Sequence, residues 1–171
     1  MECLVFARKM SAIVLNDLPE FEKFDRSLQE FDIEDPKEDQ ISKIVEKIDE
    51  LRKLCWLNLG VSRNKVKMSE FLNFIQDDID KLHKNALLNS LEKIKFDQKI
   101  KLSERNRRAL NLLLDLKNRQ ITTITLLKAC LFREESRGGH YRDDYPDKDK
   151  NWECHTRQQL NNKIQKRFIK N

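Results

Sequence analysis

Residues 103–135 read SERNRRALNLLLDLKNRQITTITLLKACLFREE and carry apolar side chains at every third or fourth position. That spacing matches the period of an α-helix, so these side chains share one helix face. The face consists of Leu110, Leu113, Leu114, Ile121, Ile124, Leu127 and Leu131. The pattern predicts one long amphipathic helix from near Ser103 to about Glu135, which needs partners to cover its apolar face.

A second helical pattern begins at Asp35-Pro36-Lys37-Glu38. Asp35 can cap a helix, Pro36 suits the first helical position, and Glu38 completes a capping box. The pattern then runs to a stop at Gly60 with one apolar face, formed by Ile41, Ile44, Val45, Ile48, Leu51 and Cys55. We therefore predict a helix over most of residues 36–60.

A third pattern lies between these two, from Ser69 to about Asn89. Its apolar positions are Leu72, Ile75, Ile79, Leu82 and Ala86. Three amphipathic helices can hide their apolar faces only against one another. The predicted fold is therefore all-α, an antiparallel three-helix bundle preceded by a short helix and followed by an irregular loop and a basic tail.

The predicted organisation has four parts. Residues 1–16 form a short helix, residues 17–34 an acidic connector, residues 35–135 the helical bundle, and residues 136–171 a docking loop with a basic C-terminal tail. The 171-residue chain has only three glycines and three prolines, which leaves few turns for a large sheet. No apolar run approaches the roughly 20 residues that span a bilayer. We expect a cytoplasmic protein with reduced cysteines and no membrane partner.

The charge is unevenly distributed. Residues 1–50 hold 14 acidic and 7 basic side chains, which is a net charge of −7. Because the whole chain has a net charge of +5, residues 51–171 carry +12. Residues 155–171 contain no acid at all. A basic half of this kind could bind nucleic acid. A solvated helix face with a frayed tail explains it more simply, and we expect nucleic acid to be an unlikely partner.

The helical segments offer little chemistry. Asp77, Asp78 and Asp80 resemble a carboxylate cluster, but the lysines beside them favour a solvated acidic face over a metal site. His83 is expected at the surface and Trp56 in a packing position. The sequence has no nucleotide-phosphate loop, no nucleophile elbow and no dinucleotide glycine fingerprint.

Residues 133–157 differ from the rest of the chain, because two of the three glycines, two of the three histidines and both tyrosines gather there. Three interpretations are open. A zinc site from Cys130, His140, Cys154 and His155 lacks paired-ligand spacing. A Cys-His nucleophile lacks an orienting third group. A docking contact fits best, since arginine, tyrosine and tryptophan favour recognition.

The same stretch carries a family resemblance. Residues 133–146 read Arg-x-Glu-Ser-Arg-Gly-x-His-Tyr-Arg-x-Asp-Tyr-Pro, followed by Asn151-Trp152 and His155. This string resembles the C-terminal domain of the succinate dehydrogenase/fumarate reductase flavoprotein family, and within it most of all the L-aspartate oxidases. The segment Glu2-Cys3-Leu4-Val5-Phe6-Ala7-Arg8 resembles the helix near the end of the FAD-binding domain. Leu51-Arg52, Trp56, Gly60-Val61 and Arg63 agree with the first bundle helix and its stop.

The resemblance implies a role without catalysis. The parent enzyme would use FAD to oxidise L-aspartate to iminoaspartate in de novo NAD biosynthesis, with quinolinate synthase as its pathway partner. The residues that hold flavin and substrate would precede this chain, so we assign it no catalytic, cofactor-binding or metal residue and expect it to be inactive alone. It would brace the FAD-binding domain of the same polypeptide. The predicted docking residues are Glu135, Ser136, Arg137, Gly138, His140, Tyr141, Arg142, Tyr145 and Trp152.

Two alternatives stay open. The chain could be a free-standing basic helical adaptor or nucleic-acid-binding protein, or the same domain from a succinate dehydrogenase or fumarate reductase flavoprotein.

Overall fold

The computed structural model describes residues 28–30, 34–92, 99–159 and 163–168. The chain divides into two compact units, one made of residues 1–31 with 94–101 and the other of residues 32–93 with 102–171. In the first unit, strand β1 (Leu28–Glu30) pairs in parallel with β3 (Lys99–Lys101). The helix expected over residues 1–16 and most of the connector expected over residues 17–34 lie outside the described residues.

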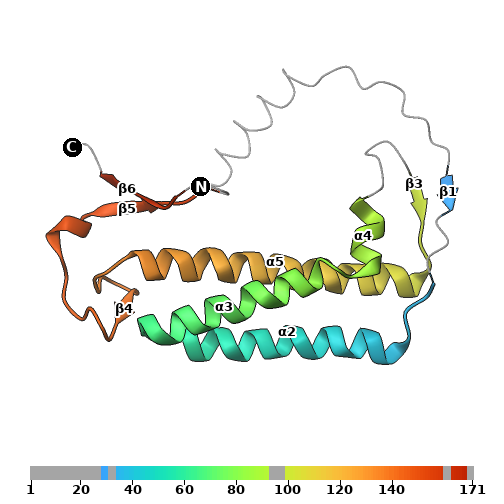
Figure 1. Ribbon diagram of the computed structural model, residues 1–171, viewed down its shortest axis with the longest axis horizontal. Helices are drawn as coiled ribbons and strands as arrows, with labels where there is room; N and C mark the ends of the chain where they lie inside the picture. The colour runs from blue at the N-terminus through green and yellow to red at the C-terminus, as the bar shows by residue number, and fades with distance from the viewer. Residues whose placement is uncertain (1–27, 31–33, 93–98, 160–162, 169–171) are drawn as a thin grey trace, which may run out of the picture. The chain divides into compact units, whose positions relative to one another are not determined.

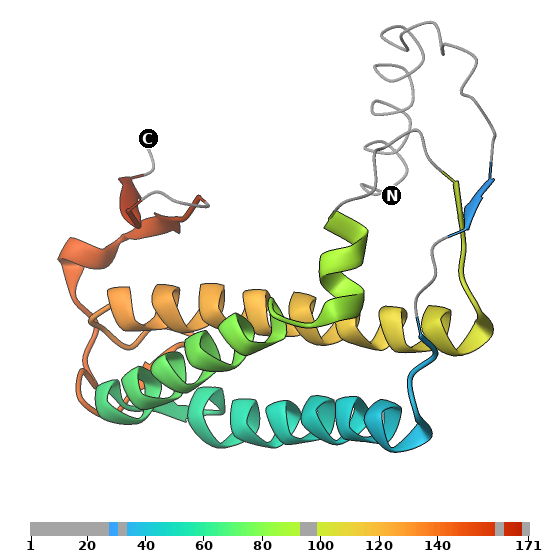
Figure 2. The same ribbon diagram turned by 45° about the vertical axis from the view of Figure 1, so that its right-hand side comes forward.

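The second unit contains three long helices, α2 (Glu38–Leu59), α3 (Lys65–Leu82) and α5 (Glu104–Phe132). They lie side by side, with α3 running opposite to both α2 and α5 (Figure 1 and Figure 2). This arrangement confirms the predicted all-α class and the antiparallel bundle. Among the described residues, no helix combines the length and apolar character needed to cross a membrane.

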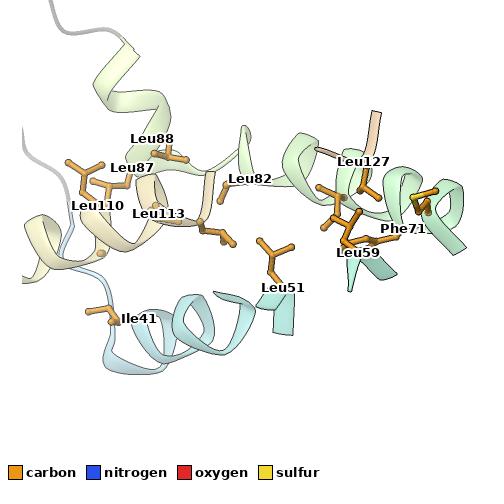
Figure 3. Close-up of a cluster of buried hydrophobic side chains, with 14 of the residues drawn as sticks. Ile41, Leu51, Leu59, Phe71, Leu82, Leu87, Leu88, Leu110, Leu113 and Leu127 are labelled. Atoms are coloured by element: carbon orange, nitrogen blue, oxygen red, sulfur yellow. The ribbon is translucent and has the colours of Figure 1, made fainter. Parts of the chain in front are cut away.

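The core lies between the facing stripes of the three helices (Figure 3). Each helix supplies side chains that are nearly or fully buried, such as Ile41 from α2, Met68 from α3 and Leu127 from α5. Three positions that the sequence placed on the apolar faces are instead exposed: Val45 of α2 is 40% exposed, and Leu114 and Ile121 of α5 are 39% and 40% exposed. Leu87 and Leu88 of the short helix α4 (Ala86–Glu92) extend the same cluster. Burial of these side chains is the main source of the bundle's stability.

The helix predicted over Ser69–Asn89 is in fact two helices. It begins earlier, at Lys65, because the Asn64 side chain accepts a hydrogen bond of 2.9 Å from the Val66 N–H and caps it. It ends at Leu82, and α4 follows after a break. The Asn85 carboxamide accepts bonds from the N–H groups of Leu87 and Leu88, so it starts a new helix instead of continuing the old one.

The predicted cap of the first helix was also wrong. Helix α2 begins after Lys37, whose N–H donates to Oε1 of Gln40 at 2.8 Å. The Asp35 carboxylate instead accepts hydrogen bonds from Ser103 Oγ and, at 2.9 Å, from Asn106 Nδ2. Asp35 therefore supports the start of α5, where Ser103 is the N-cap, next to the start predicted for this helix.

A polar contact joins all three long helices. Asp78 of α3 accepts a bond of 2.9 Å from Lys47 of α2 and one of 2.7 Å from the buried amide of Gln120 of α5. Asp78 is thus part of the packing rather than of a purely solvated acidic face. Because polar groups buried between helices need a specific partner, this contact favours one helix register.

The segment after α5 is more regular than predicted. Strand β4 (Tyr141–Arg142) pairs in parallel with β2 (Ser62–Arg63), which follows α2. A short 3-10 helix, η1 (Lys150–Trp152), leads into β5 (Cys154–Arg157), and β5 pairs antiparallel with β6 (Gln165–Phe168). Residues 165–168 of the expected frayed tail are therefore paired with β5.

We predict that Leu116→Ala lowers the free energy of unfolding by about 3 kcal/mol, because it leaves a cavity at a side chain that is only 1% exposed. Leu114→Ala on the same helix is the matched control. Its side chain is 39% exposed, so the loss should stay below about 1 kcal/mol. Urea unfolding followed by circular dichroism measures both, and equal losses would contradict the described core.

Candidate docking site

Arg142 is the centre of the segment that follows α5. Its side chain is 0% exposed. The guanidinium Nη1 donates to the carbonyl oxygens of Cys130, Leu131 and Arg133, at 3.1–3.2 Å, and Nε donates to Asp144 at 2.9 Å. The last carbonyls of a helix have no partner within it, so a cation is favourable there. Arg142 therefore closes the C-terminal end of α5.

Glu135 is the second buried charge of this segment, also 0% exposed. Its carboxylate accepts hydrogen bonds from Arg133, from Arg137 Nε at 3.0 Å and from the Asp149 N–H at 3.0 Å. Burial raises the pKa of this carboxyl, but the bonds from Arg137, Asp149 and Arg133 together lower it below its ordinary value. Glu135 is therefore held as an anion that ties both arginines to the Asp149 backbone.

Ser136 orders the backbone between these charges. Its hydroxyl donates to the Tyr145 carbonyl at 2.7 Å and accepts from the Arg142 N–H at 2.9 Å. Its own N–H donates to the Asp147 carbonyl at 3.0 Å. The segment consequently has a hydrogen-bonded interior made of its own residues.

Trp152 provides the apolar side of the same segment. Its buried ring meets Phe132 edge to face at 5.3 Å, and the Lys166 ammonium lies 3.5 Å from its centroid. Arg133 stacks near the ring at 5.5 Å. The indole therefore connects the end of α5 with β6, which is one reason why the hairpin is held close to the helix.

A tight turn forms at Gly138-Gly139. Arg137 and His140 exchange two backbone hydrogen bonds across it, of 2.8 and 3.1 Å. Gly138 has a φ of 58°, a backbone conformation that residues with a Cβ atom rarely adopt. These glycines do not cap α5, because α5 already ends at Phe132 and Arg142 binds its last carbonyls.

The nine predicted docking residues fall into two groups. Glu135, Ser136, Arg142 and Trp152 are buried within this chain, where they hold the segment together. The others lie at least partly at the surface: Arg137, Gly138, His140, Tyr141 and Tyr145. Docking through this segment stays a prediction, and it now depends on the second group. The buried group positions the surface group through the contacts given above.

The metal and nucleophile interpretations gain no support from the geometry. In the described part of the chain, no three His, Cys, Asp or Glu side chains are close enough to hold an ion. Burial raises the pKa of the Cys130 thiol, which disfavours the reactive thiolate.

One surface feature has no counterpart among the sequence-based expectations. Trp56, expected to be a packing residue, is 74% exposed, and Leu57 and Val61 beside it are exposed as well. With Leu126 of α5 they line an open groove of about 1530 Å³ between α2 and α5, which we call the α2–α5 groove. Its charged lining is mostly basic, with Arg52, Lys53, Arg63 and Arg119 against the single acid Asp49. The groove reaches the segment described above at Gly139, whose carbonyl accepts a bond of 3.1 Å from Arg63.

An exposed apolar groove on a helical bundle usually marks an interaction site. The family model for the fumarate reductase flavoprotein C-terminal domain matches residues 48–170. The chain therefore belongs to this family as a C-terminal flavoprotein domain.

Several relatives are similar in sequence to this chain over most of its length. The L-aspartate oxidase of Synechocystis sp. is 29% identical over 161 residues, which is 91% of this chain but only 28% of the relative. One polypeptide of the fumarate reductase (CoM/CoB) of Methanothermobacter marburgensis is 31% identical over 71% of this chain and 19% of its own length. This chain thus spans less than a third of these relatives.

The fold also resembles a solved structure. In the apo Sdh1 complex of Mycobacterium smegmatis, one chain matches with a TM-score of 0.50 and 24% identity, over 88% of this chain and 20% of that one. This likeness supports the fold alone.

We predict that Glu135→Gln lowers the free energy of unfolding by about 3 kcal/mol, because it leaves Arg133 and Arg137 without the buried anion between them. Glu70→Gln, at an exposed position on α3, should change it by less than about 0.5 kcal/mol. Urea unfolding measures both. Equal stability of the two variants would show that the Glu135 contacts contribute nothing.

A pH effect should come from His140. Burial and the nearby Arg63, Arg133 and Arg142 lower its pKa below the ordinary 6.5, although a hydrogen bond to the Arg133 carbonyl opposes them. The unfolded chain then binds the proton more readily, so stability should fall as the pH drops through 6.5 toward the folded pKa.

His140→Asn should flatten the dependence of the unfolding free energy on pH between about 7 and 5, where an ordinary histidine titrates. His83→Asn, at an exposed histidine, is the matched control for the substitution itself. An unchanged slope in His140→Asn would contradict the assignment.

Proposed function

We propose that this chain is the C-terminal helical domain of an FAD-dependent L-aspartate oxidase, the enzyme that converts L-aspartate to iminoaspartate in NAD biosynthesis. The observation that carries the proposal is the 91% coverage of this chain by the L-aspartate oxidase of Synechocystis sp.. The enzyme would act in the cytoplasm, and quinolinate synthase would consume its product.

The chain's own residues do not fit a flavin. A dinucleotide-binding site needs glycines at a strand-to-helix turn, where the backbone approaches the pyrophosphate. The three glycines here lie elsewhere, one after α2 and two in the turn before β4. FAD therefore belongs to another part of the polypeptide in this proposal, and no step of the oxidation passes through this chain.

The role that remains is support of the FAD-binding domain. The buried contacts of Arg142 and Glu135 fix the turn at Gly138-Gly139, which presents His140 and Tyr141 at the surface. A preorganised surface loses little conformational entropy when it docks, so it binds more tightly than a flexible one. The bundle beneath it supplies the stability.

Two other functions have specific support. The 31% identity to the fumarate reductase polypeptide of Methanothermobacter marburgensis favours a succinate- or fumarate-converting parent. The exposed side chains of Arg157, Lys163 and Arg167 in and beside the β5–β6 hairpin favour nucleic-acid binding. If the chain binds nucleic acid, it should retard RNA or DNA in a gel mobility-shift assay, and added salt should abolish this binding.

The main test supplies this chain in trans to the Synechocystis L-aspartate oxidase cut before the region that matches it. Binding should slow the release of flavin on heating and raise the stability of the truncated enzyme, by about 2.7 kcal/mol when the chain is present at roughly 100 times its Kd. Flavin fluorescence during thermal unfolding measures the effect. Unchanged flavin release, together with no binding by calorimetry, would contradict the proposed role.

A further inference from the structure

The α2–α5 groove exposes large apolar side chains, whereas the solvent-facing side of a helix is normally polar. Trp56, Leu57 and Val61 are 74%, 68% and 80% exposed, and they follow one another along the end of α2 and the turn after it. Contiguous apolar surface of this kind usually marks a binding site. Tryptophan in particular is enriched among the residues that contribute most to binding energy.

The charge around the groove restricts what can bind there. The charged lining holds four cations, Arg52, Lys53, Arg63 and Arg119, and one acid, Asp49. Asp49 pairs with Arg52 at 3.2 Å, and Arg119 pairs at 2.8 Å with Asp115, which lies outside the lining. A second copy of this chain is disfavoured, because a two-fold contact would place these cations against themselves. A nucleic acid would meet the cations but leave the apolar floor largely unpaired.

The groove is also continuous with the candidate docking site. Arg63 belongs to both, since it lines the groove and donates to the Gly139 carbonyl in the turn beside His140. Strand β2, which carries Arg63, pairs with β4. One partner surface can therefore cover the turn and the groove together.

We infer that the α2–α5 groove is the seat of an amphipathic segment of the FAD-binding domain, whose apolar side chains are flanked by acidic residues. The inference rests on the proposed function and specifies which surface of this chain makes the contact. The relatives leave ample chain to supply that segment, since this chain spans only 28% of the Synechocystis enzyme. Apolar side chains cover Trp56 and Leu57, and carboxylates meet Arg52 and Lys53.

The test measures the Kd of the 171-residue chain for a flavin-loaded, folded preparation of the same truncated Synechocystis oxidase. The double variant Trp56→Gln/Leu57→Gln should raise Kd about 30-fold, the loss that a central interface tryptophan produces. The matched control is Val66→Gln/Phe74→Gln, which removes two exposed apolar side chains of α3 outside the groove. This control should bind like the wild type.

The charge is tested in the same way. Arg52→Glu should raise Kd about tenfold at low salt and less at high salt, because the interaction is screened. Arg107→Glu is its control, since both arginines are exposed and pair with an acid three residues earlier. Circular dichroism of each variant shows whether the helices are intact.

The outcomes separate the two hypotheses. If the wild-type chain does not bind the oxidase, the proposed function fails. If it binds, and the groove variants bind within twofold of their controls, the function stands and the groove assignment is overturned. Self-association of the chain that the groove substitutions abolish, seen by analytical ultracentrifugation, would also overturn it in favour of a second copy.

Discussion

The buried guanidinium of Arg142 is the contact on which the arrangement of this domain depends. It meets three carbonyl groups at the end of α5 and the carboxylate of Asp144 at once, with no exposure to solvent. A helix end buried without partners is unfavourable, and so is an unpaired buried charge. The guanidinium of Arg142 gives the last carbonyls of α5 a donor, and those carbonyls together with Asp144 give the buried charge its partners. This contact fixes the path of the chain after α5.

That fixed point positions the rest of the C-terminal segment. Strand β4 contains Arg142 and pairs with β2 at the end of α2, so the ends of two bundle helices are joined through it. Glu135 and Ser136 then bind the backbone on either side. A loop rich in charged side chains becomes ordered because its charges satisfy one another in the interior, and only a few residues remain for contact with a partner.

The bundle and the loop were predictable to different degrees. The apolar periodicity of residues 36–60 and 103–135 was sufficient to predict two helices nearly to their ends, because burial on one face is a local pattern. The break after Leu82 was missed, since Asn85 can also lie within a helix, whereas here it caps α4, which packs against α5. Asp35 was assigned to the nearer helix start but serves the more distant one at Ser103.

Sequence by itself determined the fold class, the three long helices and the unusual nature of residues 133–157, because periodicity and composition are properties of the chain. It also carried the resemblance that the family match later confirmed. Only the tertiary structure decided that four of the nine predicted docking residues are internal and that Trp56 is exposed. Burial depends on neighbours distant in sequence: Arg142 is hidden by the end of α5, whereas the described residues leave Trp56 open to solvent.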